Sequence, residues 1–313
     1  MAHEHERRVH PRTHRPQLYS FLSISSAEWA ALACALIWAA NGLLLRTQSE
    51  HVTPAAMNAI RCAVAGLAFW LVLPFDNTSL SGLLEVELAE WGMLFAALSL
   101  GVALGDTLYL IAIKEIGVSR TMALTGTFPL TTLFWQTVLL DAPFNPSLVL
   151  GSLLVVGGLF FLSRSGGGDA RPVRLQLGMA LSLIAALCWG FSATLLKPAT
   201  VHMSSIQANA MRMPLIALLV FVVRVLPSGN ETLRGIRARS LLIVGGTGLL
   251  GMGLGAYLFI YAITQANPAK VVTLTASSPL FGMLLAAIFL KEKITPQIAL
   301  GMLLCLAGVY AVI

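Results

Sequence analysis

Three ionisable side chains lie deep inside long apolar segments of the sequence: Arg61, Asp106 and Arg212. A charged side chain at the centre of a membrane helix costs about 2.5–3.5 kcal/mol, so it normally faces a cavity or a partner. A carboxylate can exchange a proton or bind a cation, and a guanidinium can hold a carboxylate or phosphate through two parallel hydrogen bonds. These three residues are therefore the first candidates for handling a charged solute.

Asp106 is the only carboxylate well inside an apolar segment, and Tyr109, three residues later, shares its helical face. One interpretation is that Asp106 takes up and releases a proton, or pairs with a cationic part of a solute. The other is that it permanently neutralises Arg61 or Arg212. The two arginines are interpreted as gate or packing residues that bind backbone carbonyls of a neighbouring helix.

Aromatic and small polar residues at helical spacing add candidate contacts to a solute. Trp38 lies three residues before Asn41, too deep in its segment for the aromatic belt of a membrane helix. Tyr257 and Tyr261, four residues apart, share a face in a later segment. The predicted cavity residues are Trp38, Asn41, Asp106, Tyr109, Thr125, Trp189, Tyr257, Tyr261 and Thr275.

Two prolines lie beside hydroxyl-rich stretches of two other segments. Proline frees backbone carbonyls and weakens a helix. Pro129 and Pro279 are therefore predicted to mark hinge or gate positions, together with Arg61 and Arg212.

The composition shows which elements must position these residues. The 313-residue chain is 57% hydrophobic and only 11% charged, with a mean hydropathy of +0.81, whereas soluble domains are roughly 25% charged. Continuous apolar runs of about 20 residues indicate membrane-spanning helices in a lipid bilayer and exclude a β-barrel. The predicted spans are residues 29–46, 55–75, 91–113, 119–140, 147–163, 176–196, 205–226, 241–263, 269–290 and 296–313.

The remaining features point to no further chemistry. The net charge of +6 does not indicate nucleic-acid binding, because the basic residues are scattered and form no stripe. The four cysteines lie in predicted spans without metal-ligand spacing, so neither a metal site nor a cofactor is expected. Residues 1–28 are predicted to form a disordered basic tail.

The sequence repeats itself at a shift of 150 or 151 residues. The pairs that keep this register include the less common residues Trp38–Trp189, Asn58–Asn209, Arg61–Arg212 and Pro129–Pro279, together with Gly101–Gly251. We therefore predict an all-α polytopic membrane protein with two five-helix units, residues 29–163 and 176–313, joined by a linker at 164–175. Because five is odd, the second unit is inverted in the membrane, as in many secondary transporters.

Four stretches carry a recognisable pattern: LIWAANGLLLR (36–46), LCWGFSATLLK (187–197), ALTGTFPL (123–130) and TLTASSPL (273–280). They resemble the EamA repeats of the drug/metabolite transporter superfamily, and the resemblance covers residues 29–313. The first unit departs from it at Ala142, where the second unit has Glu292. The resemblance implies a ten-helix transporter of small organic solutes in the bacterial inner membrane, and it leaves the solute open.

From the repeats and the resemblance we expect a secondary transporter rather than an enzyme. It would move a small polar or amphipathic metabolite, an amino acid or related solute, by alternating access, as a proton-linked exporter or exchanger. One alternative is a facilitative exchanger, or a carrier of lipid-linked or nucleotide-sugar-type solutes, without proton coupling. Another is a non-transporting receptor or assembly partner. A monomer and a homodimer are both compatible with the sequence.

The orientation in the membrane has conflicting signals. Most basic loop residues lie on the side opposite the termini, so the positive-inside rule favours termini outside the cell. The family resemblance implies cytoplasmic termini.

Overall fold

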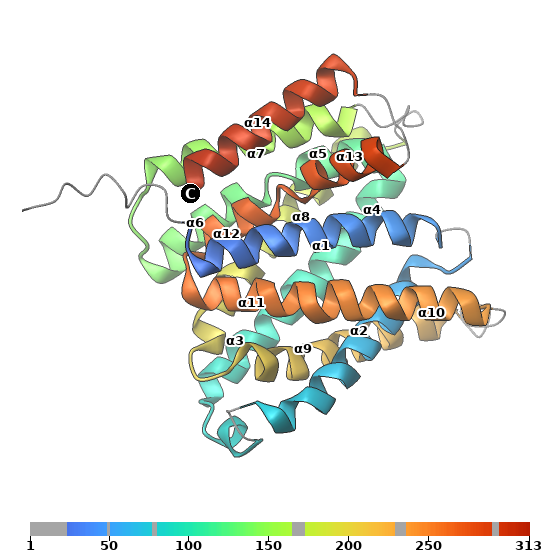
Figure 1. Cartoon of the computed structure of the whole chain (residues 1–313), viewed down its shortest axis with the longest axis vertical. Helices are drawn as coiled ribbons and strands as arrows, with labels where there is room; N and C mark the ends of the chain where they lie inside the picture. The colour runs from blue at the N-terminus through green and yellow to red at the C-terminus, as the bar shows by residue number, and fades with distance from the viewer. Residues whose placement is uncertain (1–23, 49–50, 77–79, 165–172, 229–235, 290–293) are drawn as a thin grey trace, which may run out of the picture.

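A computed structural model describes residues 24–48, 51–76, 80–164, 173–228, 236–289 and 294–313 (Figure 1). Most of these residues are helical, and no strand occurs among them. Most of the predicted tail (1–23) and most of the predicted linker (165–172) lie outside the described residues. The first helix begins at Ser26, three residues before the predicted span, because Ser25 and Glu28 form a reciprocal capping box at its start.

The first repeat contains the helical elements that lead from α1 to α7. They are α1 (Ser26–Arg46), α2 (Pro54–Val72), η2 (Leu73–Phe75), η3 (Leu80–Leu84), α3 (Leu88–Leu98), η4 (Ser99–Gly105), α4 (Asp106–Ile116), α5 (Val118–Thr125), α6 (Phe128–Leu140) and α7 (Pro146–Arg164). The stretch α3–η4–α4 is one continuous crossing in which η4 is a wider π-helical segment.

The second repeat follows the same order. Its elements are α8 (Leu175–Leu196), η5 (Pro198–Thr200), α9 (Ser205–Val220), η6 (Phe221–Val225), η7 (Leu226–Ser228), α10 (Ala238–Thr247), η9 (Gly248–Gly255), α11 (Ala256–Gln265), α12 (Pro268–Thr275), α13 (Ser278–Phe289) and α14 (Pro296–Val312). A π-helical segment, η9, again interrupts the third crossing, at the position equivalent to η4.

Within the described ranges, eight helical stretches are long and apolar enough to cross a membrane, and α14 is a shorter apolar helix. The remaining predicted crossing, 119–140, is divided into α5 and α6. Its counterpart in the second repeat is divided in the same way into α12 and α13. Pro129 and Pro279 lie in the first turn of α6 and α13, where a missing N–H costs no helical hydrogen bond. The prolines therefore begin the second half of a broken helix.

The equivalent helices α7 and α14 show that the two repeats are inverted. They lie side by side at one edge of the molecule (Figure 1). Gly158 of α7 packs on Gly301 of α14, and Gly151 packs on Gly308, so the helices run antiparallel. The two contacts exchange under the repeat shift, which is what a two-fold axis in the membrane plane requires.

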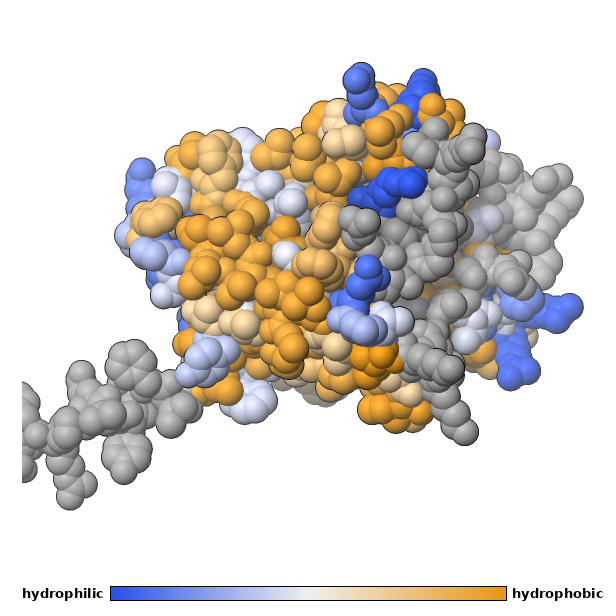
Figure 2. Space-filling view, turned by 90° about the horizontal axis from the view of Figure 1, so that it is seen from above, coloured by the Kyte–Doolittle hydropathy of each residue, from blue (hydrophilic) through white to orange (hydrophobic). Residues whose placement is uncertain are grey.

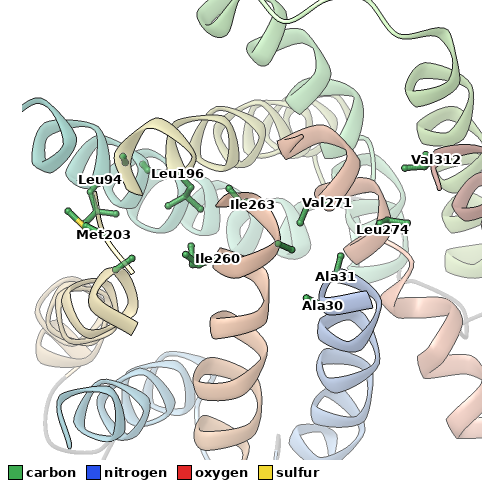
Figure 3. Close-up of a cluster of buried hydrophobic side chains, with 14 of the residues drawn as sticks. Ala30, Ala31, Leu94, Leu196, Met203, Ile260, Ile263, Val271, Leu274 and Val312 are labelled. Atoms are coloured by element: carbon green, nitrogen blue, oxygen red, sulfur yellow. The ribbon is translucent and has the colours of Figure 1, made fainter. Parts of the chain in front are cut away.

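The start of α1 and the end of α14 lie at the same end of the bundle. Lys270 of α12 forms an ion pair with Glu28 and also donates to the backbone carbonyl of Ile313 at 3.4 Å. A cluster of buried side chains underlies this end, including Ala30 and Ile263 (Figure 3). An even number of membrane crossings places the start of α1 and the end of α14 on the same side in this way.

The outer surface of the bundle is apolar. Large hydrophobic side chains such as Leu67, Leu242 and Phe289 are more than half exposed, and Figure 2 shows a broad hydrophobic surface with hydrophilic groups toward its ends. In water such a surface would be strongly unfavourable, whereas lipid tails are equally apolar. The described helices thus form a polytopic membrane protein.

A proline inside α9 leaves a backbone carbonyl free, and a tryptophan of α2 donates to it. Pro214 has no N–H, so the carbonyl of Ala210 loses its helical partner. The indole Nε1 of Trp70 donates to that oxygen at 3.0 Å. Gly66 packs against the proline ring, where a Cβ would lie 2.9 Å from Pro214 Cδ. This contact joins the equivalent helices α2 and α9 in an antiparallel pair.

The substitution Trp70→Phe is therefore expected to lower the free energy of unfolding by about 1 kcal/mol, because the buried Ala210 carbonyl loses its donor. In a Pro214→Ala background the loss should vanish, since alanine supplies the missing N–H within α9. Thermal unfolding of the detergent-purified protein measures both. An equal loss in the two backgrounds would show that Trp70 acts through packing alone.

Candidate functional site

The candidate site is built around two equivalent helix–helix crossings. In each, the first helix of one repeat packs on the π-helical segment of the other repeat. In the first, α1 packs on η9, and the indole of Trp38 lies against Gly255. In the second, α8 packs on η4, and the indole of Trp189 lies against Gly105. In each case a Cβ on the glycine would lie within 3.0 Å of the indole ring, so only glycine lets the ring approach this closely.

Each crossing has a second contact one turn along the same helices. Asn41 of α1 lies against Gly251, and Ser192 of α8 lies against Gly101. The four glycines let the helices approach closely because each leaves room for a tryptophan or a polar side chain of the facing helix. Both glycine pairs lie in π-helical segments, which are frequent at functional sites.

The two crossings differ in what the tryptophan binds. Trp38 Nε1 donates to the backbone carbonyl of Gly251 at 3.1 Å. Trp189 Nε1 donates to the carboxylate oxygen Oδ1 of Asp106 at 2.9 Å. The position equivalent to Asp106 is Ala256, so only one crossing carries a charge.

Aromatic rings surround Asp106 on the side of Trp189. The Tyr109 ring lies 5.3 Å from the Trp189 ring, and the Phe128 ring lies 6.3 Å from it in an edge-to-face arrangement. Tyr109 was predicted from its spacing, whereas Phe128 was missed. The signal that could have found Phe128 is its place at the helix break, one residue before Pro129.

The three deep charges converge from α2, α4 and α9. The charges of Arg61, Arg212 and Asp106 all interact electrostatically with the thiol of Cys62. The Asn41 amide joins them, because a Cβ at Gly251 would meet that amide and would lie 3.0 Å from Arg61 Nη2. The structure therefore brings together predicted residues from both repeats in one charged cluster.

The hydrogen bonds of the cluster differ between its amides and its arginines. Asn41 Nδ2 donates to the Thr247 carbonyl at 3.0 Å, and Asn209 Nδ2 donates to the Ala256 carbonyl at 3.3 Å. Arg212 Nη1 reaches Asn209 Oδ1 at 3.5 Å. These two amides thus bind backbone carbonyls of neighbouring helices, while the gate or packing role of Arg61 and Arg212 stays a prediction.

The other predicted residues lie at different places. The hydroxyls of Thr125 and Thr275 are buried and donate to carbonyls of their own helices, those of Thr121 and Val271. Hydroxyls in helices commonly do this, so neither needs a solute as partner.

The two predicted tyrosines of α11 stack on each other, as their spacing indicates, but reach different surroundings. The rings of Tyr257 and Tyr261 lie 6.4 Å apart and 20° from parallel. Tyr257 packs against the apolar cluster that contains Cys62. Tyr261 donates to Ser26 Oγ at 3.2 Å and lines a pocket of about 340 Å³ with Lys197 at the end of the bundle. Only Tyr257 is therefore placed beside the charged cluster.

In the described part of the chain no group of three or more His, Cys, Asp or Glu side chains is arranged to hold a metal ion. The arrangement offers two cations, one carboxylate, two amides and an aromatic wall. Such groups can bind a polar solute and exchange a proton.

Comparison with known proteins places this fold and site in a family. The model of the EamA-like transporter family matches residues 25–164 and 176–313. An uncharacterized transporter of Archaeoglobus fulgidus is 25% identical over 283 residues, covering 89% of this chain and 95% of that protein. The uncharacterized transporter YwfM of Bacillus subtilis is 26% identical over 287 residues, covering 90% and 91%.

A crystal structure of another protein shares the fold, with a TM-score of 0.78 at 18% identity. The match covers 92% of this chain and 96% of that chain, so the shared architecture includes both repeats. The two family matches, the apolar spans and the inverted repeats agree: the chain belongs to the EamA-like transporter family of the drug/metabolite transporter superfamily and is an integral membrane transporter.

Proposed function

We propose that this transporter is a secondary transporter of the bacterial inner membrane, without enzymatic activity, that moves a small polar or amphipathic metabolite by alternating access. The observation that carries the proposal is the pair of equivalent Trp–Gly crossings, built by α1 on η9 and by α8 on η4. When two inverted repeats exchange their conformations, the site opens to the opposite side of the membrane. Two matched contacts of this kind are suited to such an exchange.

The single carboxylate of the cluster supports proton linkage. Asp106 accepts a hydrogen bond from Trp189, and its charge acts on Tyr109 and on Cys62, which also feels the charges of Arg61 and Arg212. A carboxylate held by a neutral donor and by nearby guanidinium groups can change its protonation when a solute enters or leaves. Proton release would then accompany one direction of the conformational change.

The substitution Asp106→Asn is expected to abolish proton-linked transport while the fold is retained, because asparagine keeps the shape and loses the exchangeable proton. The measurement is solute-driven proton movement in proteoliposomes, followed with a pH-sensitive dye over a panel of amino acids. Asp141→Asn is the matched control, since Asp141 is exposed at a helix end in a left-handed conformation that asparagine also adopts.

Unchanged proton movement in the Asp106→Asn protein would refute the proton linkage and favour the facilitative exchanger. If the wild-type protein moved no solute under any gradient, secondary transport itself would be refuted, and the receptor or assembly-partner alternative would remain.

A further inference from the structure

A loop of the second repeat is bound to the first repeat by polar contacts at the end of the bundle where α1 begins. The loop, residues 201–204, connects η5 to α9. The backbone N–H of His202 donates to Glu90 Oε1 at 3.1 Å, and His202 Nδ1 lies 3.1 Å from Glu90 Oε2. Ser204 Oγ donates to the carboxylate of Asp76. Both contacts join one repeat to the other, so both must break if the repeats separate at this end.

The carboxylate of Glu90 depends on these contacts. It lies in the first turn of α3, and the residue is only 4% exposed. Besides His202, its side chain accepts a hydrogen bond from the backbone N–H of Glu87 at 3.2 Å. A buried carboxylate is unfavourable unless donors compensate for the lost water. Movement of the loop away from α3 would therefore remove donors that this charge needs, and the closed arrangement is favoured.

The same loop also closes this end of the bundle by an apolar contact. Met203 and Leu94 of α3 are buried in one cluster (Figure 3). Under the repeat shift they correspond to Val52 and Val244. Those two residues are likewise buried together, in a cluster at the opposite end of the bundle. The apolar part of the closure is therefore equivalent at the two ends.

The polar part of the closure is not repeated. His51 corresponds to His202, but its backbone N–H donates to the carbonyl of Gln48 in its own loop, at 3.0 Å. Ser240 stands at the position equivalent to Glu90, and it carries no carboxylate. The repeat shift therefore does not reproduce the ion pair at the opposite end. In a molecule with otherwise equivalent closures, this difference favours closure of the end that has the carboxylate.

We propose that the Glu90–His202 and Asp76–Ser204 contacts form a latch that keeps this end of the transporter closed at rest and breaks each time it opens. The inference rests on the proposed function, since it names gate residues of alternating access. Without the latch, the two ends would be held by apolar contacts alone. With it, the population shifts toward molecules that open at the opposite end. Glu90 and His202 are positioning residues, which act on the helices rather than on the solute.

Cysteine accessibility in the full-length, detergent-purified protein tests the latch without any transport step. The reporters are Ala97→Cys and Ala56→Cys. Ala97 is fully buried in the cluster that contains Leu94, and Ala56 is fully buried in the cluster that contains Val52. A water-soluble maleimide labels the cysteines, and peptide mass spectrometry measures each position separately. Glu90→Gln is expected to raise the labelling rate at position 97 at least tenfold and not to raise it at position 56.

His202→Ala provides a second test, because the side chain is 58% exposed and its removal leaves the packing intact. It should raise labelling at position 97 by a smaller factor than Glu90→Gln, since the backbone N–H of the loop remains. Added to Glu90→Gln it should have no further effect, because both changes remove the same contact. His51→Ala, at the equivalent exposed histidine, is the matched control and should change labelling at neither position.

Labelling at position 97 that Glu90→Gln leaves unchanged would overturn the proposal. An equal rise at positions 97 and 56 would overturn it as well, because the substitution would then loosen the whole bundle rather than one end. The native Cys305, buried between α7 and α14, reports unfolding. If Glu90→Gln exposes Cys305, the comparison of His202→Ala with His51→Ala decides, and equal labelling of those two variants refutes the latch.

The latch and the proposed function fail in distinguishable ways. Labelling that follows the expected pattern, in a protein that moves no solute under any gradient, would refute secondary transport and leave the contact between the repeats in place. Solute-driven proton movement in a protein whose labelling ignores Glu90→Gln and His202→Ala would refute the latch alone.

Discussion

Replacement of Gly158 with alanine is expected to destabilise the protein by about 1–3 kcal/mol, the usual cost of overpacking a close contact. A Cβ at this position would lie 2.6 Å from the carbonyl oxygen of Gly301 and 2.8 Å from the backbone nitrogen of Cys305. Both atoms belong to the backbone of α14, so they can move only if α7 and α14 separate. Separation would remove a close backbone contact between these equivalent helices of the two repeats.

Gly157 provides the control for this prediction. It is the preceding residue of α7, yet the nearest atom to a Cβ there is Leu304 Cδ1 at 3.9 Å. Gly157→Ala should therefore be neutral or slightly stabilising, because alanine favours the helix more than glycine does. The fraction folded against temperature in detergent measures both variants. Equal stability of the two would contradict the packing of α7 on α14 described above.

Replacement of Gly251 with alanine is expected to reduce transport at least tenfold, because a Cβ there would collide with the Asn41 amide and displace the nearby Arg61 guanidinium. Gly251 also accepts the hydrogen bond of Trp38 through its carbonyl oxygen. A shift of η9 away from α1 would disturb this bond and the charged cluster together. Destabilising the transport-competent arrangement of these helices by about 1.4 kcal/mol would lower its population tenfold.

Gly253→Ala is the matched control for this second prediction. Gly253 lies two residues further along η9, and the nearest atom to its Cβ would be the Gly248 carbonyl oxygen at 3.7 Å. Uptake of the transported solute into proteoliposomes, normalised to folded protein, compares the two variants. Asn41→Ala should partly restore packing in the Gly251→Ala protein, and full activity of Gly251→Ala alone would refute the importance of this crossing.

The two predictions test different consequences of the same inverted symmetry. The Gly158 contact holds equivalent helices at the edge of the bundle, where tight packing is permanent. The Gly251 contact lies beside the charged cluster, where the proposed function requires the helices to change their arrangement. We therefore expect the first variant to alter mainly stability and the second to alter mainly transport.

Most residues of the candidate site could be named from the sequence, but their contacts could not. Trp38, Trp189, Asn41 and Asp106 were identified by their depth in apolar segments and by helical spacing. Their partners lie far away in the sequence: Trp38 is 213 residues from Gly251, and Trp189 is 83 residues from Asp106. Spacing along one helix carries no information about such distant partners. Phe128 was missed for the same reason, since its role arises from a ring contact with another helix.

The sequence by itself determined the class, the number of predicted crossings and the repeat. Hydropathy is a local property that each segment carries on its own, and the common register of Trp, Arg and Pro pairs is visible without coordinates. The tertiary structure decided three other features. The fourth membrane span of each repeat is broken just before Pro129 or Pro279. The equivalent tryptophans bind a backbone carbonyl at one helix–helix contact and Asp106 at the other. Among the described residues, the buried Nε atoms of Arg61 and Arg212 have no hydrogen-bond partner. These depend on which helices approach closely, because packing between distant segments selects the hydrogen-bond partner and the atoms left without one.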